Sequence, residues 1–226
     1  MEMMNGRYMA ETQQRLLLAA PKARNDVLAQ RDYHCFAALI ITGMRIQEWT
    51  RLTVPMVRLG LVTGWLVSRR EHCKGKRRAN EYCVTAPLRM HLEALLRIHA
   101  EQGAGHDEPE GGAPLVWGRD LAGRSCALSV RSYQVRLKHW AEVAGLDPRI
   151  SPHWLRHTRG MNVLRRSRGT NPLKVAQIAL NHASLASTSV YLRMSREEVE
   201  RDLQEVDGRR LPKRVARRMA EEARHA

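Results

Sequence analysis

The heptapeptide PHWLRHT, residues 152–158, contains both the start of a predicted helix and a group of basic side chains. Ser151 followed by Pro152 is typical of a helix N-terminus, because proline lacks the backbone N–H that the first turn leaves unpaired. His153 and Arg156 are three positions apart and therefore share a face of this helix. Arginine binds two phosphate oxygens at once through its planar fork, and histidine can move a proton. This face is therefore suited to chemistry on a phosphate.

Apolar residues recur at helical intervals over most of the chain on either side of this heptapeptide. The predicted helices cover residues 7–20, 26–41, 45–52, 87–100, 129–144, 152–167, 172–180 and 186–192, with Pro21 separating the first two. Two short β-prone runs, residues 64–67 and 81–85, flank a basic stretch and predict a small antiparallel sheet with a basic turn. The expected fold class is therefore mainly α with a small antiparallel β-sheet.

The chain has 226 residues, which is enough for one sizeable domain, and we expect that domain to cover residues 1–206. Residues 102–114 are rich in Gly, Pro and acidic residues, and they predict a solvated loop within the domain rather than a boundary. From residue 197 onward, acidic and basic residues alternate at helical spacing. Residues 207–226 are expected to form a basic helical tail.

The charge balance indicates a polyanionic partner. Lys and Arg number 38 against 23 Asp and Glu, which gives a net charge of +15, and neutralising phosphates with such a surface releases condensed counterions. A basic structural protein, such as a ribosomal component, would show the same balance without the ordered motifs described below. The N-terminus has no signal-peptide pattern and no apolar run is long enough to span a membrane, so we expect a cytoplasmic protein.

The cysteines give little support for a metal site. Cys35, Cys73, Cys83 and Cys126 include no CxxC pair, and a cytoplasmic chain would keep them reduced. A zinc site built from Cys73, Cys83 and His72 would have a spacing that fits no standard zinc module. Free thiols are the favoured interpretation.

Breaking a DNA phosphodiester without losing its bond energy needs a nucleophile, a clamp for the transition-state charge, and an acid for the leaving 5′ oxygen. Tyrosine is a suitable nucleophile because it leaves again readily when the free hydroxyl attacks back. Taken singly, each candidate residue is more often an ordinary helix, turn or core residue. In chain order the sequence offers Arg45 in TGMRIQE (42–48), Lys74, His153, Arg156, His182 in LNHAS (180–184), and Tyr191.

In this order the motifs resemble the phage integrase, or tyrosine recombinase, family. The family segments read TG[LM]R..E, HxLRHT and LGHxS…T..Y, and this chain has TGMRIQE, HWLRHT and LNHASLASTSVY. The resemblance covers about residues 10–205. It implies the tyrosine recombinase catalytic-domain fold. It also implies a site-specific DNA recombinase, such as a mobile genetic element carries, that cleaves and rejoins strands through a 3′-phosphotyrosyl intermediate during integration, excision or inversion.

The same resemblance assigns roles to the basic residues. Arg45 and Arg156 would clamp the nonbridging oxygens of the scissile phosphate, which stabilises the transition state electrostatically. His153 and His182 would hydrogen-bond the phosphate and assist proton movement. Glu48 is interpreted as a supporting residue that orients its neighbours.

The resemblance also assigns the nucleophile and the general acid. Tyr191 would form the 3′ link to DNA, with Tyr82 and Tyr133 as the alternatives if it does not. Lys74 would protonate the leaving 5′ oxygen, and Lys76 is the alternative because several basic residues crowd this turn. No metal or nucleotide cofactor is implied, since the covalent link conserves the bond energy.

The chain departs from the family pattern at three positions. Cys73 stands where the first Gly of a G-K-G turn would be. Asn181 replaces the usual Gly before His182, and because Asn tolerates left-handed backbone angles the turn could survive. Arg159 stands where an apolar or aromatic residue is common, and the sequence leaves open whether it faces DNA.

The partners implied are double-stranded DNA, a homotetramer on two DNA sites and a DNA-bending accessory protein, with no membrane and a nucleoid-associated location. Residues 197–206 could dock onto a neighbouring subunit, and the basic turn and residues 129–140 are candidates for DNA contact. Arg45 comes too early for a preceding DNA-binding domain, which fits either an isolated catalytic domain or a compact form similar to fimbrial phase-variation recombinases. Two other functions stay open, a type IB topoisomerase-like enzyme and a catalytically silent DNA-binding accessory factor.

Overall fold

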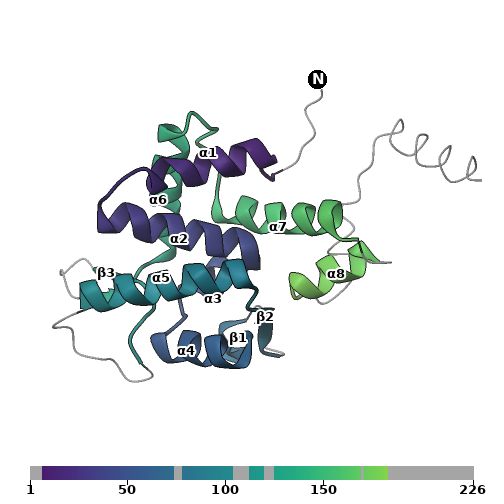
Figure 1. Cartoon of the computed structure of the whole chain (residues 1–226), viewed down its shortest axis with the longest axis horizontal. Helices are drawn as coiled ribbons and strands as arrows, with labels where there is room; N and C mark the ends of the chain where they lie inside the picture. Colours follow the sequence, from purple (N-terminus) through teal and green to yellow (C-terminus); the bar gives the residue numbers. More distant parts are fainter. Residues whose placement is uncertain (1–6, 74–77, 104–111, 120–124, 169–170, 183–226) are drawn as a thin grey trace, which may run out of the picture. The chain divides into compact units, whose positions relative to one another are not determined.

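The helix α2 (Val27–Thr42) runs through the middle of the structure, a computed structural model that describes residues 7–73, 78–103, 112–119, 125–168 and 171–182 (Figure 1). Helix α2 packs against α1 (Glu11–Lys22), α5 (Ala86–Gly103) and α7 (Pro152–Arg166). The remaining elements, in chain order, are α3 (Ile46–Trp49), α4 (Val54–Thr63), β1 (Trp65–Ser68), the 3₁₀ turn η1 (Arg70–His72), β2 (Asn80–Cys83), β3 (Trp117–Arg119), β4 (Ser125–Ala127), α6 (Val130–Val143) and α8 (Pro172–Ala179). The mainly α fold with small antiparallel sheets is confirmed.

The sequence explains why α2 is central. Its side chains are buried around most of its circumference, Phe36 and Leu39 among them, as expected for a helix that is apolar on several faces. The carboxylate of Asp26 caps its first turn by accepting a hydrogen bond from the Ala29 N–H at 2.8 Å. Gly43 ends it in the left-handed conformation at φ +63°.

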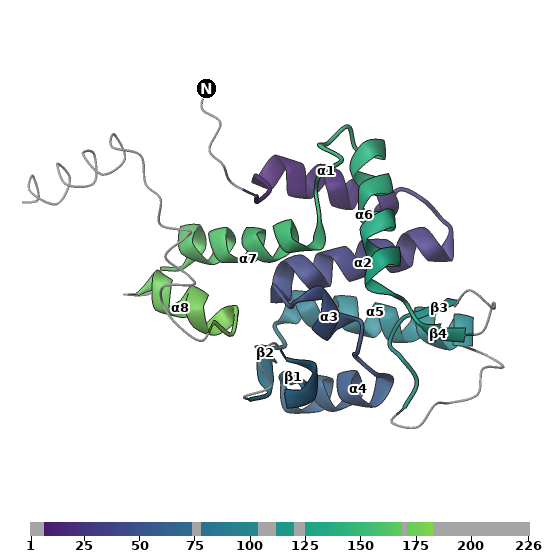
Figure 2. The ribbon, with the colours of Figure 1, turned by 180° about the vertical axis from the view of Figure 1, so that it is seen from behind.

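One apolar core joins most of the elements. Large side chains that are almost fully buried come from α2, α3, α5, α6 and α7, namely Phe36, Trp49, Leu92, Leu137 and Leu155. Figure 2 shows α6 lying over α2, and Arg136 of α6 forms an ion pair with Asp32 of α2. The core therefore holds α2, α6 and α7 together. It fixes the position of α7, which carries Arg156, and of α2, whose end is followed by Arg45.

The predicted hairpin is confirmed. Strands β1 and β2 are antiparallel, with Trp65 opposite Cys83 and Ser68 opposite Asn80. Burial alternates along both strands, so Asn80 and Tyr82 both point inward. This alternation turns two polar side chains of β2 towards the interior.

Several other predictions about secondary structure were wrong in detail. The sheet β1–β2 is accompanied by a second hairpin, β3–β4, whose three-residue strands have no alternating pattern to reveal them. Helix α4 was not predicted, and Pro55 lies in its first turn, where a proline is accepted because the backbone N–H there has no partner within the helix. Pro21 does not end α1, which runs one residue further and buries that ring.

The predicted loop 102–114 is only partly correct. Gly103 closes α5, and residues 104–111 lie outside the described residues. Ala113 and Pro114 are buried instead of solvated, because the Val54 N–H donates to the Ala113 carbonyl at 2.9 Å. The end of the segment therefore pairs with the chain that enters α4.

The described residues all belong to one compact unit, Met1–Thr188. The helices predicted at residues 186–192 and after residue 197, and the domain boundary predicted near residue 206, lie outside the described residues. In the part of the chain that the structure describes, no helix has the length and apolar character needed to span a membrane.

Candidate active site

Arg156 lies where the ends of three helices meet. It is 5% exposed on α7 and donates from Nη1 to the Gly43 carbonyl and from Nη2 to the Leu180 carbonyl, both at 2.6 Å. Gly43 ends α2 and Leu180 follows α8. A Cβ on Gly43 would lie 2.7 Å from Leu180 Cδ2, so only glycine lets these elements approach so closely. The guanidinium is thus fixed by backbone oxygens from two other elements.

Arg45 follows the same glycine turn and occupies the N-cap position of α3. Its Nη1 donates to Glu48 Oε1 at 3.1 Å, and its side chain is 29% exposed while that of Glu48 is 1% exposed. One side of this guanidinium is therefore held by a buried carboxylate, and the group still reaches the surface. This is the geometry of a cation held in place for an external anion.

Glu48 connects α3 to the inward face of β2. Its two carboxylate oxygens accept hydrogen bonds from Asn80 Nδ2 at 3.2 and 3.1 Å, and Oε2 accepts one from the Tyr82 hydroxyl at 2.7 Å. These are the contacts expected of a residue that orients its neighbours, Arg45 above all. From the sequence, Tyr82 was named only as an alternative nucleophile and Asn80 was not selected, and alternation along β2 places the two on the same face.

The three histidines of the site are all shifted towards the neutral form. Burial, followed by the positive charge of Arg156, lowers the pKa of His153. Burial lowers the pKa of His182 to about 4, with Arg156 as the next cause and Arg45 after it. Burial and then the neighbouring His153 lower the pKa of His157 to about 4. The charges of Arg45 and Arg156 lower the pKa of both His153 and His182, so these four of the six predicted catalytic residues share one electrostatic environment.

His157 is a further residue of this cluster that the sequence analysis did not select. Its Nε2 lies 2.5 Å from His153 Nε2, and the two rings meet edge to face with centroids 4.1 Å apart. Two neutral imidazoles in this arrangement share one proton between the facing nitrogens. The signal was present in the sequence, because positions i and i+4 of a helix are neighbours on its surface.

Asn181 sets the position of His182. It has φ +50°, as expected for a residue that replaces glycine in a left-handed turn, so the prediction that Asn preserves this turn is confirmed. Its Nδ2 donates to the Glu81 carbonyl at 2.9 Å, which ties the end of α8 to β2. The His182 N–H in turn donates to the Gln177 carbonyl at 3.0 Å.

Lys74, Lys76 and Tyr191 lie outside the described residues. The preceding residue in the described part of the chain, Cys73, is buried, and its Sγ lies 3.3 Å from the Arg69 carbonyl oxygen. Cys83 is exposed, and the described residues contain no group of three or more His, Cys, Asp or Glu side chains placed to hold a metal ion.

The two tyrosines proposed as alternative nucleophiles both have their hydroxyl groups in buried hydrogen bonds. The hydroxyl of Tyr82 donates to the buried carboxylate of Glu48, and burial together with that negative charge raises its pKa. The hydroxyl of Tyr133 accepts a hydrogen bond from Trp49 Nε1 at 3.0 Å, and complete burial raises its pKa well above the usual value. Neither phenol can present an accessible phenolate to DNA.

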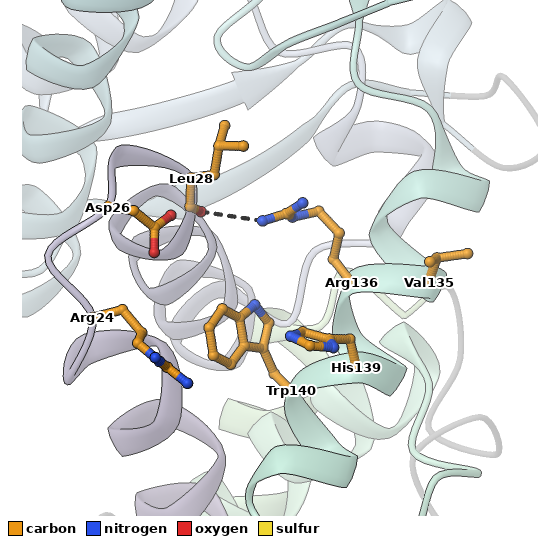
Figure 3. Close-up of a pocket in the computed structure, with 7 residues that line it drawn as sticks. All are labelled: Arg24, Asp26, Leu28, Val135, Arg136, His139 and Trp140. Carbon is orange, nitrogen blue, oxygen red and sulfur yellow. Dashed lines mark hydrogen bonds between the residues drawn. The ribbon is translucent and has the colours of Figure 1, made fainter.

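A pocket of about 520 Å³ lies away from this cluster, between the link from α1 to α2 and helix α6 (Figure 3). Arg136 crosses it towards the Leu28 carbonyl at 3.5 Å, and Trp140 Nε1 donates to Asp32 at 2.7 Å on its inner side. Of the predicted catalytic residues, the four that the structure describes do not line it; the lining residues are Arg24, Asp26, Leu28, Val135, Arg136, His139 and Trp140.

Comparisons with known proteins identify relatives of the chain. The model of the phage integrase family matches residues 7–198. The chain is 28% identical over 195 residues to tyrosine recombinase XerD of Pseudomonas aeruginosa, covering 85% of this chain and 59% of that protein. It is 29% identical over 186 residues to tyrosine recombinase XerC of Neisseria gonorrhoeae, covering 82% and 54%. The chain thus spans 54–59% of the length of these two curated relatives.

Two solved structures show the same fold. The crystal structure of XerA recombinase superposes with a TM-score of 0.67 at 19% identity, covering 93% of this chain and 66% of that one. The pre-cleavage complex of XerH recombinase bound to difH substrate gives a TM-score of 0.63 at 17% identity, covering 87% and 53%.

Proposed function

The chain belongs to the phage integrase family, and from this premise we propose that it is the catalytic part of a site-specific DNA recombinase. It cleaves and rejoins DNA strands through a 3′-phosphotyrosyl intermediate. The observation that carries the proposal is the cluster of Arg45 and Arg156 with His153 and His182 around the junction of α2, α7 and α8. Such a cluster is built to hold a phosphate and to exchange protons with it.

The two arginines stabilise the transition state. Attack on phosphorus adds negative charge to the nonbridging oxygens, and preorganised guanidinium groups stabilise that charge without reorganising during the reaction. Arg156 is held by two carbonyl oxygens and Arg45 by the buried carboxylate of Glu48. Both cations are therefore fixed before DNA arrives.

The histidines act as hydrogen-bond donors, and they become protonated when a phosphate binds beside them. Burial and the arginines keep His153 and His182 neutral in the unbound protein. A phosphate brings negative charge, which raises the pKa of both groups. Each can then donate to a nonbridging oxygen and assist the movement of the proton.

Tyr191 is the nucleophile, and Lys74 protonates the leaving 5′ oxygen, with Lys76 as the alternative acid. The order of the motifs supports both assignments. Tyr191 is supported further by the engagement of Tyr82 and Tyr133 in buried hydrogen bonds. No metal or nucleotide takes part, because the phosphotyrosyl link keeps the bond energy for religation.

The partner is double-stranded DNA, on which four copies of the chain assemble across two sites, with a DNA-bending protein assisting. The net charge of +15 supports the DNA partner. Two of the similar structures are titled as complexes with DNA, XerH with difH substrate and the Tn1549 transposon integrase with circular intermediate DNA. Residues 1–206 form the catalytic domain and residues 207–226 a basic tail, and the protein acts in the cytoplasm at the nucleoid.

Covalent trapping tests the proposal directly. Wild type and Tyr191→Phe are expressed in cells, the cells are lysed in detergent, and protein-linked DNA is precipitated and sequenced. Wild type is expected to yield adducts that recur at one sequence, and Tyr191→Phe none. Adducts that persist in Tyr191→Phe would refute this nucleophile, and Tyr82→Phe is the matched control that keeps Tyr191.

Type IB topoisomerase chemistry predicts a different pattern in the same experiment. Adducts would scatter over the DNA, and wild type would relax a supercoiled plasmid that lacks the recurrent sequence. A catalytically silent accessory factor would give no adducts while still binding DNA. The distribution of adducts therefore separates the three functions.

A further inference from the structure

Arg159 lies beside the catalytic junction but takes no part in it. It is on α7 one turn after Arg156, about 5 Å further along the helix axis. The stem of its side chain packs against the glycine turn, because a Cβ on Gly43 would lie 2.9 Å from Arg159 Cγ. Arg159 therefore occupies the same corner between α2, α7 and the end of α8 where Arg156 is bound.

The guanidinium of Arg159 is partly buried, and it makes no hydrogen bond or ion pair with the part of the chain that the structure describes. Its Nε is buried without a hydrogen-bond acceptor, and no carboxylate among the described residues forms an ion pair with it. Burial lowers the pKa of Arg159, which indicates how unfavourable this environment is for a charge. An anion that approaches this guanidinium would supply an acceptor and stabilise its charge.

Two other arginines, both buried, differ from Arg159 in their hydrogen-bond partners. Arg31 is as deeply buried as Arg156, and it forms an ion pair with Asp32 at 3.2 Å. Arg156 donates to two carbonyl oxygens. Arg31 also has an Nε without an acceptor, but its two other nitrogens are paired, whereas Arg159 makes no hydrogen bond or ion pair with the described residues.

We propose that Arg159 is a DNA-binding residue that contacts a backbone phosphate next to the one held by Arg45 and Arg156. This inference rests on the proposed function, because it requires DNA to lie over the cluster. Arg159 is a fixed planar donor at the edge of that cluster, and a phosphate provides the acceptor that its guanidinium lacks. A contact of this kind positions the strand and reads no bases.

The test measures DNA binding and stability separately. Wild type, Arg159→Met and Arg159→Lys are titrated into a short fluorescent duplex of arbitrary sequence at several salt concentrations, and each is also melted without DNA. The matched control is Arg166→Met, which removes one charge from the same helix at an exposed ion pair with Glu11.

We expect Arg159→Met to bind more weakly and to lower the slope of log K against log salt by about 0.9, the value for one lost phosphate contact. Its melting temperature without DNA should equal or exceed that of wild type, since an unpaired buried charge is removed. Arg159→Lys and Arg166→Met should keep the wild-type slope.

Two results would overturn the inference while the proposed function stands. In the first, Arg159→Met keeps the wild-type slope and affinity. In the second, Arg159→Met melts well below wild type with an unchanged slope, which means that Arg159 pairs with an acidic side chain of the protein itself. Failure of the wild type to bind the duplex would instead count against the DNA-cleaving function, and the inference would fall with it.

Discussion

Replacing Glu48 by Gln tests how Arg45 is held, since it keeps the shape of the side chain and removes its charge. One carboxylate oxygen becomes an NH₂ group, and the hydrogen bonds to that carboxylate come from Arg45, Asn80 and Tyr82, all donors. In either orientation the new NH₂ faces at least one donor in a site that is 1% exposed. The substitution therefore creates a buried mismatch in addition to the loss of charge.

The magnitude follows from these contacts. An unsatisfied buried donor costs about 1–3 kcal/mol, and hydrogen bonds that lose their charge weaken by about 1 kcal/mol, so we expect a loss of about 2–4 kcal/mol. For a domain of this size the corresponding fall in Tm is about 5–15 °C. Because Arg45 also loses its carboxylate partner, adduct formation should fall even at temperatures where Glu48→Gln is fully folded.

Thermal melting and covalent trapping on the same preparations check this prediction. Tyr82→Phe is the matched control, because it removes one of the hydrogen bonds to Glu48 and leaves the contact with Arg45 in place. It should cost about 1–2 kcal/mol and keep most of the activity per folded molecule. A Glu48→Gln variant that melts within about 1 °C of wild type would refute the reasoning, since that shift is below 1 kcal/mol.

Three further outcomes follow from the same geometry. Gly43→Ala should lower the free energy of unfolding by about 2–4 kcal/mol in urea, because φ is +63° and the added Cβ meets two side chains closer than 3.0 Å. Asn181→Ala should cost about 1–2 kcal/mol while Asn181→Gly costs less, since φ is +50° there, and equal losses would contradict this. Stability should fall as the pH drops from about 6.5 to about 4, because below the unfolded pKa of 6.5 the unfolded chain binds protons that the native His34, His157 and His182, with pKa near 4, do not. Urea titrations across this range check the last prediction, and a flat profile would refute it.

Local sequence signals predicted the helices that carry the site. Helix α7 begins at Pro152 as expected, and α6 is followed by Gly145 in the left-handed conformation. These features depend on residues close together in the chain, so periodicity and capping were sufficient. The assignment of Arg45 and Arg156 to one site came from the order of the motifs, and in the structure Arg156 donates to the carbonyl of Gly43, two residues before Arg45.

Features that depend on residues far apart in the sequence could not be predicted from periodicity and capping. The buried network of Glu48 requires β2 to present Asn80 and Tyr82 to α3, which is decided by the register of the hairpin. Strand β3 has three residues and no apolar alternation, so only its pairing with β4 defines it. The position of Arg159 against Gly43 likewise joins two residues that are far apart in the sequence.

The two arginines of the site are held by different means, and the difference affects its charge. Arg45 is held by the buried carboxylate of Glu48, whereas two N–H groups of Arg156 donate to carbonyl oxygens, which carry no net charge. The positive field of Arg156 is consequently felt around it, since it lowers the pKa of His153, His157 and His182. A carboxylate in place of the Gly43 and Leu180 carbonyls would fix the guanidinium equally well but would weaken that field and the attraction for phosphate. The junction of helix ends therefore holds the Arg156 guanidinium through backbone oxygens, close to the three histidines whose pKa values its charge lowers.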